Sequence, residues 1–84
     1  MEEIDKALGQ TLKKVRTGKK WSQEKLALEA EANRNYVSLI ELGRNSPSVG
    51  MLFRLCTALG VSPSSVLQDV EKLVGRTTMT KIFR

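Results

Sequence analysis

The sequence predicts an all-α domain built from five short helices. Apolar residues recur at helical spacing in five segments, and serine or asparagine caps precede four of them. The composition agrees, because 40% of the residues are apolar but only 5% are aromatic, which suits a small helical core of aliphatic side chains. A chain of 84 residues has room for one such core and a short appendage.

The first helix is expected over residues 3–17. Acidic residues near its start suit the positive end of a helix dipole. Gly9 lies inside this helix, where glycine costs up to about 1 kcal/mol relative to alanine. We therefore expect another helix to approach closely at Gly9. The inner face would consist of Ile4, Leu8, Thr11, Leu12 and Val15.

The second helix is expected over residues 23–30. Ser22 can cap it, and Trp21 can pack on Leu26 to form a hydrophobic staple. Only residues 31–33 then separate it from the next helix. So short a link makes two helices cross steeply, as in a helix-turn-helix arrangement.

The third helix is expected over residues 34–42, with Asn33 as its cap and Gly43 as the left-handed residue that ends it. Its apolar inner stripe would consist of Tyr36, Val37 and Ile40, while its outer side carries Arg34, Asn35, Ser38 and Leu39. A helix presented in this way fits the major groove of DNA.

The last two helices follow a loop at residues 44–47. Ser48 can cap the fourth helix and Gly60 can close it, while Ser62 and Pro63 form a typical start for the fifth. The expected inner faces are Val49, Leu52, Leu55, Cys56 and Leu59 for the fourth helix, and Val66, Leu67, Val70, Leu73 and Val74 for the fifth. The arc of the fifth helix is wide, so we expect part of it to meet a second subunit. We predict a DNA-binding and dimerisation domain over residues 1–74, followed by a flexible basic tail over residues 75–84.

Charge and composition narrow the range of functions. Fourteen basic and nine acidic residues give a net charge of +5, which favours a polyanion as the partner. The chain has neither an apolar run long enough for a membrane span nor a secretory signal, so a cytoplasmic location is expected. One cysteine and no histidine exclude an intrachain disulfide and argue against a metal site or cofactor. With no histidine, paired carboxylate or activated nucleophile in view, we do not expect an enzyme.

Base recognition is expected from the start of the third helix. Arg34 can donate two parallel hydrogen bonds to guanine, Asn35 can pair with adenine, and Leu39 can touch a thymine methyl group. The alternative is that Arg34 and Asn35 are solvated surface residues and that Leu39 is a rim residue of the core.

Phosphate contacts are expected around that helix. Gln23, Asn33 and Ser38, with the backbone amides that open the second and third helices, provide donors suited to phosphate oxygens. The loop residues Arg44 and Asn45 are further candidates. The alternative is that Asn33 acts only as a helix cap and that Arg44 is an ordinary loop cation.

Several motifs in a fixed order resemble the phage-repressor (XRE/Cro) type of helix-turn-helix protein over roughly residues 8 to 67. The matching residues are Leu8-Gly9, Arg16, Ser22-Gln23-Glu24-x-Leu26-Ala27, Tyr36-Val37-Ser38-x-Ile40-Glu41-x-Gly43, Pro47-Ser48-Val49 and Ala58-Leu59-Gly60-Val61. Within that family the chain is similar to the controller proteins of restriction-modification systems and to compact phage-type repressors.

The resemblance implies a five-helix, lambda-repressor-like DNA-binding domain. It also implies that Gln23 contacts a phosphate and that Ser38 lies at the groove wall. Arg34, Asn35 and Leu39 would face base edges. The resemblance further implies an ion pair between Arg16 and Glu41.

Two positions depart from the family pattern. Glu31 and Lys20 stand where the family usually has glycine. In the turn, a side chain at positive φ costs about 1 kcal/mol or slightly more.

Together these features predict a sequence-specific, DNA-binding transcriptional regulator. It would bind an inverted-repeat operator as a homodimer formed through Val66, Val70 and Leu73, and could contact RNA polymerase. The alternative is an antitoxin-type interaction module, in which DNA binding is secondary and a protein partner binds the fifth helix or the tail, including Ile82 and Phe83.

Overall fold

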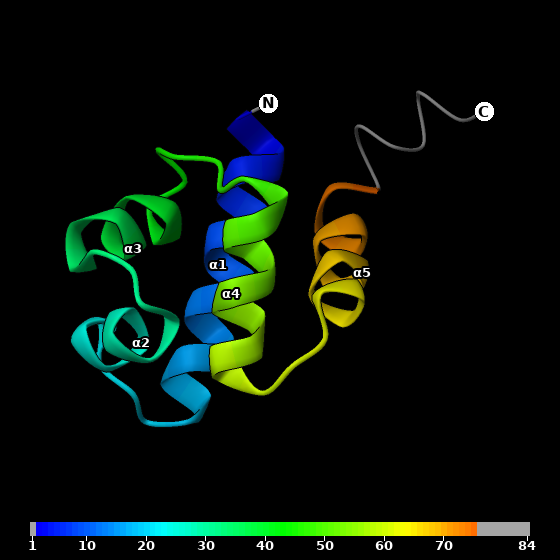
Figure 1. Cartoon of the computed structure of the whole chain (residues 1–84). Coiled ribbons are helices and arrows are strands. Elements are labelled where there is room, and N and C mark those ends of the chain that lie inside the picture. Colours follow the sequence, from blue (N-terminus) through cyan, green and yellow to red (C-terminus); the bar gives the residue numbers. More distant parts are fainter. Residues whose placement is uncertain (1, 76–84) are drawn as a thin grey trace.

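The computed structural model describes residues 2–75 and shows five α-helices, with no strand in that range (Figure 1). The five predicted helices are confirmed, with each observed end within one residue of the expected one where an end was predicted. The predicted tail lies outside the described residues except for Gly75. The helices are α1 (Glu2–Gly18), α2 (Gln23–Ala30), α3 (Arg34–Glu41), α4 (Val49–Leu59) and α5 (Pro63–Val74).

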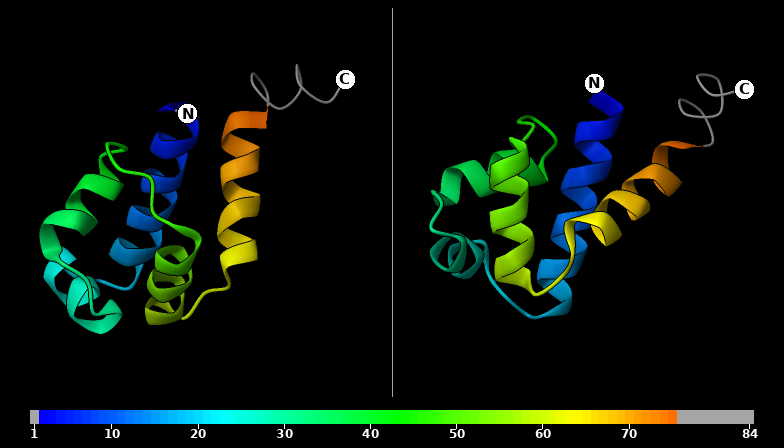
Figure 2. Two further views of the ribbon diagram at one scale, coloured as in Figure 1. Left: turned by 45° about the horizontal axis from the view of Figure 1, so that its top comes forward. Right: turned by 45° about the vertical axis from the view of Figure 1, so that its right-hand side comes forward.

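The helix α1 is the centre of the arrangement. It packs against α3 on one side and α5 on the other, while α4 packs against α2 and α5. Figure 2 shows the same order in two further views, with α2 and α3 on the side of the molecule opposite α5. The most deeply buried large side chains come from all five helices and are Leu12, Leu26, Val37, Ile40, Leu55, Leu59 and Val66.

Side-chain caps start four of the helices, as predicted. The Ser22 and Ser48 hydroxyl oxygens accept hydrogen bonds from the third helical residue at 3.0 and 3.1 Å. Ser62 does the same for α5 at 3.1 Å, and the Asn33 side chain accepts from the second residue of α3 at 2.7 Å. These local bonds explain why the boundaries could be predicted from the sequence.

Glycine allows α1 to touch the end of α3. A Cβ atom added to Gly9 would lie 2.3 Å from the carbonyl oxygen of Ile40 and 2.7 Å from that of Glu41. The close approach expected at Gly9 is therefore confirmed, and its partner is the C-terminal turn of α3. Gly43, at φ 76°, ends the same turn and lies against Lys6 of α1.

Two predictions about the apolar faces are wrong. Val49, expected in the core, is 72% exposed because it is the first residue of α4 and points away from the packed side. Val66 and Val70, expected at a dimer interface, are only 2% and 5% exposed. The contact between α5 and α1 buries them in the core of their own chain, so of the three expected interface residues only Leu73, at 55%, remains accessible.

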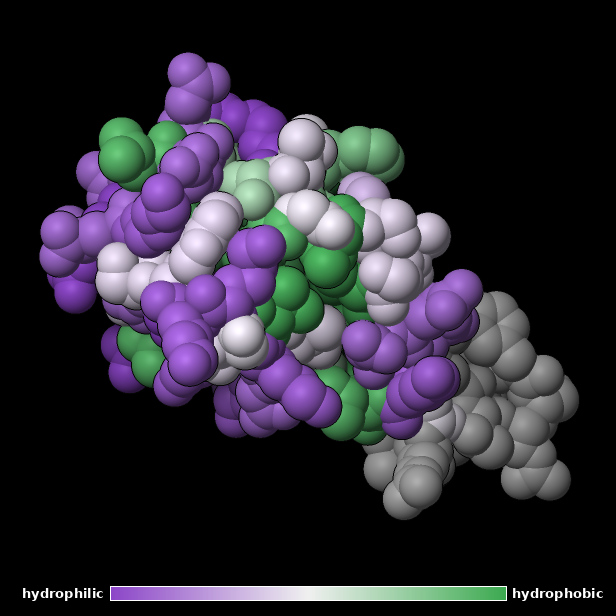
Figure 3. Space-filling view, turned by 90° about the horizontal axis from the view of Figure 1, so that it is seen from below, coloured by the Kyte–Doolittle hydropathy of each residue, from purple (hydrophilic) through white to green (hydrophobic). Residues whose placement is uncertain are grey.

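The face of the molecule drawn in Figure 3 is mainly hydrophilic. Seen from below in Figure 3, apolar side chains gather in a central area that hydrophilic residues surround. Within residues 2–75 no single helix is long and apolar enough to cross a membrane; α4 and α5 meet that test only jointly, across a bend of 107°.

Candidate nucleic-acid interface

The helix α3 has one anchored side and one exposed side. Val37 and Ile40 are each 1% exposed and hold the helix against the core. Arg34, Asn35 and Leu39 lie on the exposed side, as the helical spacing predicted. An eight-residue helix held along one face can therefore present the other face to a large partner.

A buried ion pair fixes the C-terminal end of α3 to α1. The Arg16 Nε and Nη2 atoms donate to the two carboxylate oxygens of Glu41 at 2.6 and 2.9 Å, so the pair implied by the resemblance is present and bidentate. Arg16 Nη1 also donates to the carbonyl oxygen of Trp21 at 2.7 Å, just before α2. One guanidinium thus joins α1, the entrance to α2 and the end of α3.

Gln23 completes this network. Its Nε2 atom donates to Oε1 of Glu41 at 3.0 Å, so the first residue of α2 is tied directly to α3. The sequence reasoning assigned Gln23 to a phosphate and missed this bond. A side-chain amide has two N–H donors, so the bond to Glu41 leaves a second donor for an external acceptor.

Asn33 serves as the cap that the sequence predicted. Its Oδ1 accepts from the backbone N–H of Asn35 at 2.7 Å. Its side-chain NH2 group can still donate to a phosphate, so the two roles assigned to Asn33 are compatible. Ser38 is half-buried on the same helix.

The turn between α2 and α3 contains a strained residue. Glu31 ends α2 at φ 54° and ψ 48°, in the left-handed region. Lys20, in the preceding turn, has φ 62°. Both residues that replace a family glycine therefore adopt a conformation that glycine tolerates better.

Arg54 of α4 supports this turn, a contact that the sequence reasoning missed. Its Nε donates to the carbonyl oxygen of Ala30 at 3.2 Å, and its Nη2 donates to that of Glu31. A guanidinium is well placed there, because the C-terminal end of a helix carries partial negative charge. No local signal could have revealed the contact, since Arg54 lies 23 and 24 residues away along the chain.

Charged side chains surround the start of α2. Oε1 of Glu24 lies 3.8 Å from Nε of Arg34, and both side chains are largely exposed. Lys19 and Lys25 hold their ammonium groups 5.0 and 5.4 Å from the centre of the Trp21 ring. The Glu24 contact was also missed, although Glu24 belongs to the motif that carries the family resemblance.

The loop after α3 folds back on the helix. The backbone N–H groups of Arg44 and Asn45 both point to the carbonyl oxygen of Leu39, at 2.9 and 3.3 Å. Any phosphate contact by these two residues must therefore use their side chains. The Arg44 side chain is exposed and Asn45 is half-buried.

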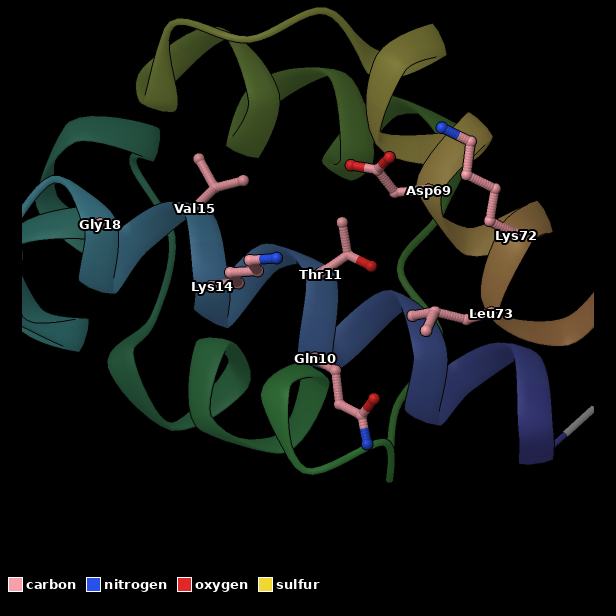
Figure 4. A pocket seen from close by; sticks show the side chains of 8 residues that line it. All are labelled: Gln10, Thr11, Lys14, Val15, Gly18, Asp69, Lys72 and Leu73. Atoms are coloured by element: carbon pink, nitrogen blue, oxygen red, sulfur yellow. The ribbon is translucent and has the colours of Figure 1, made fainter.

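A groove with a volume of about 570 Å³ lies elsewhere, between α1 and α5. In Figure 4, Thr11 and Val15 extend from α1, and Asp69 and Leu73 extend from α5 toward the space between the helices. The accessible member of the expected dimer surface, Leu73, thus lies at this groove and away from the exposed side of α3.

The described residues offer no clustered ligands for a metal ion, and their one cysteine is buried. Residues 2–75 contain no cluster of three or more histidine, cysteine, aspartate or glutamate side chains that could hold a metal ion. Cys56 is fully buried, and burial raises the pKa of its thiol. The thiol therefore remains protonated and packs as an apolar group.

The fold and the exposed side of α3 define a DNA-binding transcriptional regulator of the helix-turn-helix class. A model of the Helix-turn-helix family matches residues 12–66. The chain belongs to this family, in its phage-repressor type, and is homologous to the controller proteins of restriction-modification systems.

The similar proteins are named controllers or regulators. Control protein C.BamHI of Bacillus amyloliquefaciens is 40% identical over 60 residues, which cover 70% of this chain and 74% of that protein. The crystal structure of the restriction-modification controller protein C.AhdI from Aeromonas hydrophila matches with a TM-score of 0.72 and 35% identity, over 74% of this chain and 94% of that one. The controller C.Esp1396I, solved as a tetramer with its natural 35 base-pair operator, matches with a TM-score of 0.77 and 25% identity, over 84% and 93% of the two chains.

Proposed function

We propose that the protein binds an inverted-repeat operator as a homodimer and so controls the genes of a restriction-modification system. Each subunit would place α3 in the major groove. The observation that carries this proposal is the two-sided character of α3, whose Val37 and Ile40 side is buried while Arg34 and Asn35 are exposed at its start. The homology to C.BamHI and C.AhdI supports the regulatory role.

Base reading is assigned to the exposed side of α3. The planar fork of Arg34 matches O6 and N7 of guanine, and the amide of Asn35 matches N6 and N7 of adenine. Leu39 is 36% exposed one helical turn after Asn35 and could contact a thymine methyl group. Each good bidentate pair discriminates against a wrong base by about 1–3 kcal/mol.

Phosphate contacts are assigned to the rim of α3. The donors are the side chains of Gln23, Asn33, Ser38, Arg44 and Asn45, together with backbone amides at the starts of α2 and α3. Gln23 would link a phosphate to the Glu41 carboxylate, because its amide already donates to Glu41. These contacts would set the orientation of α3 without reading sequence.

Dimerisation is assigned to the accessible side of α5, with Leu73 as its apolar centre. C.Esp1396I binds its operator as a tetramer, so oligomeric binding is known in a related controller. Two-fold symmetry of a dimer requires an inverted repeat, with half-sites about one helical turn apart. Residues 1–74 would then serve both DNA binding and dimerisation.

Regulation would follow from operator occupancy. A dimer near a promoter can block RNA polymerase or recruit it by direct contact. The proposal includes no chemical step and no cofactor, and it places the protein with the DNA in the cytoplasm.

The test is selection of bound oligonucleotides from a random pool, using the full chain. We expect enrichment of a palindrome whose half-sites lie about one helical turn apart. Enrichment of a site without two-fold symmetry would contradict the homodimer, and a pool without any enriched sequence would contradict sequence-specific binding.

A further inference from the structure

The contact between Glu24 and Arg34 joins the two helices at the proposed DNA surface. Glu24 lies in the first turn of α2, and Arg34 is the first residue of α3. The carboxylate oxygen Oε1 lies 3.8 Å from Nε of the guanidinium, and the two side chains are 79% and 56% exposed. Neither the base contacts nor the phosphate contacts proposed above use Glu24.

The atom that Glu24 approaches is informative. A guanidinium has one Nε and two terminal Nη groups, and all five of its N–H bonds lie in one plane. At 3.8 Å the carboxylate makes no hydrogen bond to the guanidinium, so both Nη groups stay available. Those groups can form the two parallel hydrogen bonds to O6 and N7 of guanine.

We infer that Glu24 is a positioning residue that orients Arg34 for reading guanine. The carboxylate restricts rotation of the guanidinium about its long side chain and directs the Nη fork away from α2. This inference rests on the proposed function, because it needs Arg34 at a base edge. Glu24 itself makes no base contact in this arrangement.

The strength of the interaction between Glu24 and Arg34 depends on whether water or DNA surrounds the pair. In free protein the pair is exposed, and water screens it strongly. When DNA covers the surface and excludes water, the same two charges interact more strongly. Glu24 therefore orients Arg34 mainly in the complex, where orientation decides which base is accepted.

Glu24 also affects binding to DNA of any sequence. Its negative charge lies near the phosphates and partly neutralises Arg34, so it weakens nonspecific binding. A positioning residue of this kind lowers general affinity while it raises discrimination. These two effects separate it from an acidic residue that only stabilises the start of α2.

The test compares Glu24→Gln with Glu29→Gln in the full chain. Glu29 lies on the same helix, pairs with Lys25 at 3.0 Å and is 44% exposed, so the control removes the same charge away from Arg34. Affinity is measured for the selected operator and for an operator in which the guanine read by Arg34 is replaced. The readout is the ratio of these two affinities.

We expect both variants to bind random DNA more tightly than the parent, and Glu29→Gln to leave the ratio unchanged. Glu24→Gln should lower the ratio about 3- to 10-fold, part of the roughly 5- to 150-fold discrimination of one bidentate pair. In an Arg34→Ala background, Glu24→Gln should have no further effect on the ratio. Unfolding midpoints of both variants check that loss of a helix-stabilising charge does not explain the result.

The outcomes distinguish this inference from the proposed function. If Arg34→Ala lowers the ratio but Glu24→Gln does not, the positioning role is wrong and base reading by Arg34 stands. If Glu24→Gln lowers the ratio even without Arg34, Glu24 acts through another contact and the inference is also overturned. If Arg34→Ala leaves the ratio unchanged, both the assignment of Arg34 and the role of Glu24 fail.

Discussion

Glu31 and Lys20 give the turns on either side of α2 an energetically unfavourable backbone conformation. Both have positive φ, at 54° and 62°, where an L-residue with a side chain costs about 1–2 kcal/mol relative to the right-handed region. At Glu31 the hydrogen bonds from Arg54 to the carbonyl oxygens of Ala30 and Glu31 help to hold the turn. These contacts involve backbone carbonyls, so they do not depend on the Glu31 side chain.

Replacing Glu31 with glycine should therefore stabilise the protein. We expect Glu31→Gly to raise the free energy of unfolding by about 0.5–1 kcal/mol, because relief of the Cβ clash exceeds the extra chain entropy of glycine. The unfolding midpoint should rise by a few degrees in a thermal melt. Glu31→Ala is the matched control, since alanine removes the charge but keeps Cβ, and an equal gain in both variants would assign the effect to charge.

Replacing Arg34 with alanine should reduce the preference for operator over random DNA. The loss corresponds to about 1–3 kcal/mol of discrimination, because one bidentate base contact disappears. The measurement is the ratio of affinities for selected and random DNA at one salt concentration. An unchanged ratio would remove Arg34 from base reading, and Asn35→Ala would then test the neighbouring position in the same way.

The junction between α1 and the end of α3 decides how the recognition helix is held. Gly9 lets the backbones touch, and the Arg16–Glu41 ion pair closes the same junction a short distance along α1. Both side chains of the ion pair are nearly buried, at 9% and 3% exposure. A buried bidentate pair of this kind fixes geometry as well as contributing energy.

Adding a methyl group at Gly9 should disturb this junction. Gly9→Ala brings Cβ against the backbone carbonyls of Ile40 and Glu41, which cannot rotate away, so we expect a loss of about 3 kcal/mol in the free energy of unfolding. Operator affinity should fall too, because the end of α3 is displaced. Gly18→Ala is the control in the same helix, where a Cβ atom meets nothing within 4 Å; if both variants melt alike, the junction is not tightly packed.

The elements differ in how far the sequence could predict them. The start of a helix depends on a cap within three residues along the chain. The starts of four helices could therefore be predicted from Ser22, Asn33, Ser48 and Ser62. The periodicity of α5 predicted an apolar arc but not which partner covers it, and α1 covers Val66 and Val70. Interactions between residues more than 20 positions apart, such as those of Arg54, depend on the assembled fold. The Arg16–Glu41 pair was expected only from the family resemblance.

The whole molecule carries a net charge of +5. Because the proposed contacts neutralise DNA phosphates, we expect the affinity for DNA to fall as the salt concentration rises. Each neutralised phosphate adds about 0.9 to the slope of log affinity against log salt concentration. Arg44 is a useful probe because its side chain is exposed in the loop that follows α3, while its backbone amide is occupied by Leu39.

Arg44→Ala should weaken binding to operator and random DNA by a similar factor. The slope of log affinity against log salt concentration should become shallower by about 0.9, the value for one phosphate contact. Arg44→Lys should keep the slope, because the charge remains. Titrations at several salt concentrations give both quantities. A slope that Arg44→Ala leaves unchanged would place this side chain away from the DNA backbone.

The proposed dimer contact lies on a different side of the molecule from the exposed side of α3. Val66 and Val70 belong to the core, so a charge at Val70 would unfold the chain instead of separating subunits. Leu73 is exposed beside the groove between α1 and α5, where an apolar side chain can contact a second copy without contributing much to its own core.

Leu73→Glu should therefore separate the subunits while the fold remains intact. The new carboxylates would meet near the two-fold axis, and burying them unpaired is costly. We expect a shift toward monomer in sedimentation and an unchanged helical circular-dichroism spectrum. Binding to the palindromic operator should weaken more than binding to a single half-site. Leu28→Glu is the control, because Leu28 is exposed on α2 and the same substitution there should leave the dimer in place. A Leu73→Glu protein that sediments as a dimer would move the interface to another surface, with the exposed Phe53 of α4 as the next position to test.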